Sequence, residues 1–154
     1  MLELVRISVC PKAEIIGVVN AGLDALCAYI AFPVDKARRL QLATEEIYLY
    51  TINTIRRAGL KSTVTVRFRC YSDGFQIVVE YIGPRGPYDS YLKPGQLQSL
   101  KVKDFDALGL CLAANVLDTL KASFWSVEGI NSYLLSLNSC RLSRQGIVKQ
   151  SLTR

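Results

Sequence analysis

The 154-residue sequence contains no histidine, and it has only one tryptophan and one methionine. It therefore lacks the side chain that most often serves in general acid–base catalysis and as a nitrogen ligand of metals. The five cysteines are scattered, and no pair shows the C-x-x-C spacing of structural metal sites. They are Cys10, Cys27, Cys70, Cys111 and Cys140. Metal ligation and histidine-based catalysis are unsupported, and we expect no metal site.

Signals for export and for membrane insertion are also missing. The N-terminus has no charged segment followed by an apolar run, and the number of cysteines is odd, which suits a reducing cytoplasm. The most apolar window, "IIGVVNAGLDALCAYIAFPV", is interrupted by Asn20 and Asp24. We therefore expect a cytoplasmic protein without a membrane span, and we interpret this window as a core helix.

The basic residues are unevenly distributed. The formal net charge is +6, and residues 140–154 contain four basic residues and no acidic one. Removing these four from the 19 basic residues leaves 15 against 13 acidic ones, so the rest of the chain is nearly neutral. A nucleic-acid-binding domain would gather Lys and Arg on one face of the fold. We expect one domain over residues 1–139, a basic tail over 140–154 and no direct contact with nucleic acid.

Two periodicities divide the domain. Helical spacing of apolar residues predicts helices over Ala13–Phe32, Asp35–Arg57 and Asp106–Ala122. Alternation predicts a strand over Leu4–Cys10, a hairpin over Ser62–Gly83 with "SDG" as its turn, and a closing strand pair over 123–139 around Gly129. Gly83–Asp104 is broken by glycine and proline and predicts a long loop. This order predicts an α+β two-layer sandwich with helices on one face of a mixed β-sheet.

Four segments carry a family resemblance through their order and spacing. They are "LQLATEEIYLYTI", "VEYIGPRGPYD", "DALGLCLAANVLDTL" and "VEGINSYLLSL". From about Val5 to Leu137 the chain resembles the ATP-binding domain of the GHKL superfamily, the gyrase and histidine-kinase type. It is most similar to the small anti-sigma-factor serine kinases. The resemblance implies a Bergerat-type ATP-binding fold.

The resemblance also assigns roles to residues. In the family a helix supplies a glutamate that polarises the attacking group, and four residues later an asparagine that holds magnesium. On this sequence these positions fall on Glu46, the candidate catalytic residue, and on Tyr50. The aspartate that reads adenine in the family falls on Tyr81. The nucleotide-binding positions that the resemblance implies are Tyr50, Tyr81, Gly83, Arg85 and Gly109.

Several of these positions depart from the family pattern. A phenol is a poor magnesium ligand, because the ion prefers carboxylate and amide oxygens. Alternation places Tyr81 on the covered face of its strand, where the ring would fill a base pocket. Close approach of the backbone to phosphate needs glycines, and Arg85 stands where one is usual. We therefore expect a lost or weakened ATP site and no cofactor.

Two functions of different classes follow. The first is a regulatory protein resembling an anti-sigma factor, which binds a sigma factor or an anti-anti-sigma factor in a partner-switching circuit; the resemblance also implies a possible homodimer. The alternative is an active ATP-dependent serine/threonine protein kinase acting on an anti-anti-sigma factor. That kinase would use ATP and magnesium, with Glu46 as base and Arg85 and Gly109 near the phosphates. A structural domain of a longer regulator is a third possibility.

Structural interpretations of the same residues stay open. Glu45 and Glu46 could be a solvated pair or partners of Arg38 and Arg39. Tyr48 and Tyr50 could be core aromatics whose hydroxyls reach the rim. The loop residues Arg85, Tyr88 and Tyr91 have no evident packing role in the sequence, and their types are enriched at protein interfaces. Cys70 and Cys111 lie in apolar runs and are expected to be buried free thiols.

Overall fold

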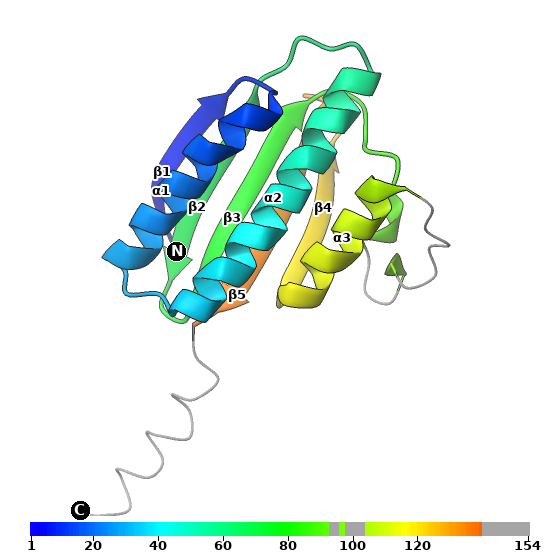
Figure 1. Ribbon diagram of the computed structural model, residues 1–154. Coiled ribbons are helices and arrows are strands. Elements are labelled where there is room, and N and C mark those ends of the chain that lie inside the picture. The colour runs from blue at the N-terminus through cyan, green and yellow to red at the C-terminus, as the bar shows by residue number, and fades with distance from the viewer. Residues whose placement is uncertain (93–95, 98–103, 140–154) are drawn as a thin grey trace, which may run out of the picture.

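The computed structural model describes residues 1–92, 96–97 and 104–139 (Figure 1). Within this part the strands are β1 (Leu2–Val9), β2 (Val64–Tyr71), β3 (Gly74–Ile82), β4 (Thr119–Trp125) and β5 (Ile130–Asn138). The α-helices are α1 (Ile16–Tyr29), α2 (Val34–Arg57) and α3 (Phe105–Val116), and the short 3-10 helices are η1 (Ala13–Ile15) and η2 (Asp89–Tyr91). The predicted basic tail, Cys140, and residues 93–95 and 98–103 of the predicted loop lie outside the described residues.

The five strands form one sheet in the order β1-β2-β3-β5-β4. Every neighbouring pair is antiparallel, so the predicted mixed sheet is wrong for the described strands. The reason lies in the last hairpin. Because β5 is antiparallel to both β3 and β4, those two strands run in the same direction across the α3 connection. The returning strand β5 lies between them, and no parallel contact forms.

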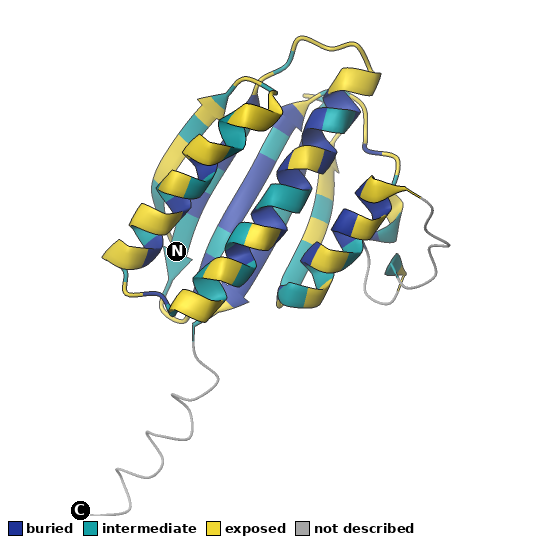
Figure 2. Cartoon of the chain, in the orientation of Figure 1, coloured by how far each residue is buried: buried dark blue, intermediate teal, exposed yellow. Residues whose placement is uncertain are grey.

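The three α-helices cover one face of this sheet, which confirms the predicted α+β class and the placement of the helices (Figure 1). Buried residues gather between the two layers, on the central strands and on the inner faces of the helices (Figure 2). On β2 the alternation seen in the sequence is confirmed, because Val64, Val66 and Phe68 are fully buried. None of the described helices combines the length and the apolar character that a membrane crossing requires.

The predicted end of the second helix is correct, and that of the third helix is wrong. The second helix ends at Arg57, as predicted, and Gly59 follows with a φ of 65°. The third was predicted to continue to Ala122 but ends at Val116, because Leu117 is extended and β4 starts at Thr119. Apolar residues in this stretch fit a helical period, and pairing with β5 nevertheless draws it into the sheet.

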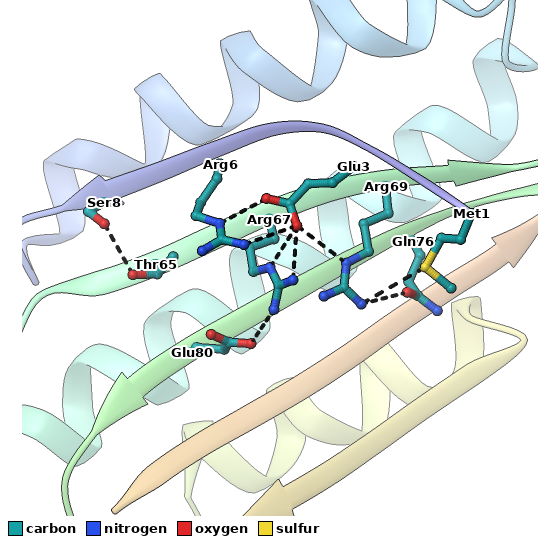
Figure 3. Close-up of polar contacts among 9 residues, drawn as sticks. All are labelled: Met1, Glu3, Arg6, Ser8, Thr65, Arg67, Arg69, Gln76 and Glu80. Atoms are coloured by element: carbon teal, nitrogen blue, oxygen red, sulfur yellow. Dashed lines mark hydrogen bonds and ion pairs between the residues drawn. The ribbon is translucent and has the colours of Figure 1, made fainter. Parts of the chain in front are cut away.

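The face of the sheet away from the helices carries a charged network over β1, β2 and β3 (Figure 3). The Arg67 guanidinium lies at its centre, with Nη1 3.0 Å from Glu80 Oε1 and Nη2 2.9 Å from Glu3 Oε2. Arg6 Nε donates to Glu3 Oε1 at 2.8 Å. These arginines hold the pKa of Glu3 well below its usual range, at about 2. The network therefore joins three strands on their solvent side.

Candidate functional site

Two of the predicted nucleotide-binding residues lie in a buried aromatic cluster. Tyr50 on α2 and Tyr81 on β3 flank Tyr133 on β5, and all three side chains are almost fully buried. The ring centroid of Tyr133 lies 5.6 Å from that of Tyr50 and 6.3 Å from that of Tyr81, with the second pair stacked. We call Tyr50, Tyr81, Tyr133 and the adjacent Asp89 the tyrosine cluster. Its rings fill part of the core between α2 and the sheet.

A carboxylate from the loop completes this cluster. Asp89 is buried, and its Oδ1 accepts hydrogen bonds from Tyr50 Oη at 2.7 Å and from Tyr133 Oη at 2.9 Å. Its Oδ2 accepts from the Gly86 amide at 2.9 Å. A buried charge is tolerated when hydrogen-bond donors surround it in this way. Because three donors already hold the carboxylate, Asp89 is a structural anchor of the loop.

The protonation of the tyrosines fits this role. Burial raises the pKa of Tyr50, and the Asp89 carboxylate raises it further. Burial likewise raises the pKa of Tyr81 to about 12, and it raises the pKa of Tyr133. The hydroxyls therefore remain protonated at neutral pH, so those of Tyr50 and Tyr133 donate to Asp89 and that of Tyr81 donates to the Pro84 carbonyl. The three tyrosines of the cluster therefore offer no phenolate nucleophile.

Gly86 is required by this packing. A Cβ atom at Gly86 would overlap Tyr50 Oη and lie 2.6 Å from Asp89 Oδ1, and both groups are buried. The Tyr88 amide also donates to Tyr50 Oη, at 3.0 Å. The loop therefore has a packing role that is not evident from the sequence. Tyr88 itself hydrogen-bonds Asp104, so the loop is attached at several points.

Gly83 and Arg85 lie beside the tyrosine cluster. Gly83 has a φ of 155°, and its carbonyl accepts a hydrogen bond from Asn131 Nδ2 at 2.8 Å. Tyr81 Oη donates to the carbonyl of Pro84 at 2.6 Å. The Arg85 side chain is exposed, and its guanidinium lies 5.7 Å from the ring centroid of Phe124. The Arg85 guanidinium thus lies over the Phe124 ring on β4, which is an edge strand of the sheet.

Glu46 and Gly109 meet at a second location, between α2 and α3. Glu46 Oε2 occupies the space that a Cβ atom at Gly109 would fill, so the missing side chain lets the carboxylate approach α3. No donor in the described part of the chain hydrogen-bonds this carboxylate. Burial raises its pKa, with smaller contributions from the charges of Glu45 and Asp106. Glu46 is thus a partly buried carboxylate without a partner among the described residues.

The neighbouring acid has a different environment. Glu45 Oε1 accepts a hydrogen bond from Asn20 Nδ2 on α1, at 2.7 Å. The alternative that the two glutamates pair with Arg38 and Arg39 is wrong, because Arg39 Nε instead donates to the Val116 carbonyl at 3.1 Å. The pair of acids that stands out in the sequence is therefore divided by the fold. One member bridges to α1, and the other faces α3.

The start of α3 carries carboxylates of the chain itself. Asp104 caps the helix by accepting from the Ala107 amide at 2.9 Å. Asp106, which is buried, accepts from Asn53 Nδ2 at 2.9 Å and pairs with Arg57. A helix N-terminus attracts anions such as phosphate, but here side-chain carboxylates already use it. Asp104 would repel a phosphate group at the same place, whereas the charge of Asp106 is already offset by Arg57.

The fold thus brings Tyr50 and Tyr81 together around Tyr133, and it brings Glu46 against Gly109 at a separate location. Sequence reasoning missed Asp89, Tyr133 and the contact between Asn53 and Asp106. The alternation of β5 could have indicated that Tyr133 faces the core. No group of three or more acidic or cysteine side chains converges as a metal site in the described ranges. The cysteines there are free, and Cys70 and Cys111 are half-buried, not buried as expected.

No protein-family model matches the chain, and no curated protein matches it either.

Proposed function

We propose that this chain is a regulatory protein-binding module of the anti-sigma-factor type, built on a Bergerat-type scaffold and working without ATP. It would act in the cytoplasm, in a partner-switching circuit, by binding a sigma factor or an anti-anti-sigma factor. A homodimer is part of the same proposal. The tyrosine cluster is the observation that carries it.

The argument from the cluster is one of space and charge. The positions that would read adenine and hold magnesium are Tyr81 and Tyr50, and both are tied into a closed set of contacts with Tyr133 and Asp89. A nucleotide entering there would have to displace buried rings and break hydrogen bonds to a buried carboxylate. The Asp104 carboxylate at the start of α3 adds repulsion toward phosphate. Protein binding needs none of these changes.

Calorimetric titration with Mg-ATP tests the proposal. We expect binding weaker than a Kd of about 1 mM, which is a free energy less favourable than about −4.1 kcal/mol. A partner protein should also bind with the same affinity in the presence and absence of Mg-ATP. Low-micromolar, magnesium-dependent ATP binding would overturn the proposal and favour the serine/threonine kinase.

Glu46→Gln separates the two functions further. In a kinase that uses Glu46 as base, this variant would still bind ATP but would lose phosphate transfer to an anti-anti-sigma factor. In the proposed regulator, wild type and variant give the same background in a transfer assay with labelled ATP. Glu45→Gln is the matched control, since it removes the adjacent charge on the same helix.

A further inference from the structure

The outer surface of the helical layer carries exposed apolar residues where solvated charges would be ordinary for a helix in water. On α3 the exposed side chains are Phe105 at 90%, Leu108 at 50% and Leu112 at 42%. On α2, Leu42 and Leu49 are each 38% exposed. Exposed residues mark these outer helix surfaces in Figure 2, on the side away from the sheet.

Helix geometry places these five residues around one carboxylate. Glu46 lies four residues after Leu42 and three before Leu49, so the three side chains share one face of α2. Gly109, which Glu46 touches, lies four residues after Phe105 and three before Leu112 on α3. We call Leu42, Glu46, Leu49, Phe105, Leu108 and Leu112 the Glu46 face.

The central carboxylate has no partner in the described part of the chain. Glu45, one residue away, hydrogen-bonds Asn20, and Asp106 pairs with Arg57. Burial and these two nearby charges disfavour the ionised form of Glu46 and raise its pKa. A partly desolvated acid ringed by apolar side chains would gain most from a cation that arrives with an apolar surface of its own.

We propose that the Glu46 face is the docking site for an amphipathic helix of a partner protein, whose apolar residues cover the leucines and Phe105 while one Arg or Lys pairs with Glu46. The assignment of the occupant rests on charge complementarity: one unpartnered negative charge lies within an apolar surface. A helix that lays its apolar side along another helical surface is a common mode of peptide recognition. This inference rests on the proposed function, because it names the surface through which the regulator would bind its partner.

Synthetic peptides provide the probe. Two fluorescein-labelled helical peptides of 18 residues, built from leucine, alanine and glutamine, differ only in a central Arg or Gln. At 1.5 Å per residue they extend over about 27 Å, longer than the roughly 18 Å of α3. Fluorescence anisotropy with the 154-residue protein gives the Kd of each peptide. The wild type is expected to bind the Arg peptide about tenfold tighter than the Gln peptide, because only the Arg peptide pairs with the acid.

Three variants locate the interaction. Glu46→Gln removes the preference for the Arg peptide, whereas Glu45→Gln keeps it, since Gln can still accept from Asn20. Leu108→Asp combined with Leu112→Asp weakens both peptides, and both positions are exposed, so the fold is retained and is checked by circular dichroism. Three results would overturn the proposal. The wild type could bind both peptides with equal affinity, or Glu45→Gln could lose the preference for the Arg peptide as much as Glu46→Gln does. The third is no binding of the Arg peptide up to about 1 mM.

A second copy of the chain is the competing occupant. Analytical ultracentrifugation of the wild type and of the Leu108→Asp, Leu112→Asp variant tests it. A wild type that is dimeric and a variant that is monomeric would replace the peptide proposal with a homodimer interface. The ATP titration reports on the tyrosine cluster and the peptide titration on the Glu46 face. Tight ATP binding with an intact Arg preference would remove the proposed function alone, and weak ATP binding without that preference would remove this inference alone.

Discussion

At the scale of single residues, Asp89 shows how a loop is held against a core. Its two carboxylate oxygens accept from Tyr50, Tyr133 and the Gly86 amide. All three groups are hydrogen-bond donors, so this position suits a side chain that only accepts hydrogen bonds. The anionic form of aspartate meets that requirement, whereas an amide of the same size does not.

Asp89→Asn is therefore expected to lower the free energy of unfolding by about 1–3 kcal/mol, because the amide NH2 would face a donor and leave a buried group unsatisfied. Urea unfolding followed by circular dichroism measures the change. Ser90→Ala, at the exposed neighbouring position, is the control and should stay within about 0.5 kcal/mol of wild type. An asparagine variant as stable as the wild type would show that the carboxylate does not anchor the loop.

At the scale of elements, the ends of α1 and α2 form a natural comparison. Both helices close with the same pair of backbone hydrogen bonds. After α1, the Phe32 amide donates to the Cys27 carbonyl and the Ala31 amide to the Ala28 carbonyl. After α2, the Leu60 amide donates to the Ile55 carbonyl and the Gly59 amide to the Arg56 carbonyl. The residue with positive φ is Gly59 after α2 but Ala31, at 53°, after α1. Only glycine adopts this conformation without a steric cost.

Ala31→Gly should accordingly raise the free energy of unfolding by roughly 1 kcal/mol, since it relieves a left-handed conformation that disfavours a Cβ atom. Gly59→Ala is the reciprocal variant and should lower stability by a similar amount, as no neighbour lies within 4 Å of the added Cβ to change the balance. Thermal and urea unfolding of both variants provide the measurement. Opposite signs are required, and a loss of stability in both would contradict the explanation.

The same two helix ends explain what the sequence could predict. Gly59 identifies the end of α2, whereas nothing in the sequence indicates that Ala31 adopts a glycine-like conformation, and the first helix was predicted to run to Phe32. Residues 123–125 of β4 were predicted as a strand, but its start at residues 119–122 was assigned to the third helix, for a different reason. Its apolar residues fit a helix when read alone, and only the pairing with β5 makes them a strand.

Some features of the candidate site follow from local sequence patterns, and others depend on the completed fold. The burial of Tyr81 follows from strand alternation, which is local. The bonds of Asp89 to Tyr50 and Tyr133 join residues 39 and 44 positions apart, so they depend on the completed fold. The approach of Glu46 to Gly109 likewise depends on how α2 and α3 pack. Local patterns predicted which residues are buried, and tertiary packing decided which of them meet.

At the scale of the whole molecule, the charged network links the solvent side of β1, β2 and β3 and makes stability depend on acid pH. The pKa of Glu3 is about 2 in the folded chain and 4.5 in the reference state. The unfolded chain therefore binds more protons in this range, and stability falls as pH decreases from about 4.5 to about 2. Above that window the contribution of Glu3 is fully present.

Glu3→Gln tests this dependence. The variant should lose stability at neutral pH, and its difference from wild type should shrink as pH falls through the window and should also shrink in high salt, which screens exposed charges. Urea unfolding between pH 2 and pH 7 follows both curves. A constant difference across the whole range would mean that the ion pairs do not produce the effect.

The pairing of β1 with β2 has a consequence during synthesis. These partners lie between 55 and 68 residues apart, from Val9 with Val64 to Leu2 with Cys70. At 5–20 residues per second a ribosome needs roughly 3–14 s to make the second strand after the first. Through that interval the residues of β1 have no strand partner, and both helices of the connection are made before β2. A chaperone near the ribosomal exit would therefore meet the unpaired β1 segment before the sheet exists.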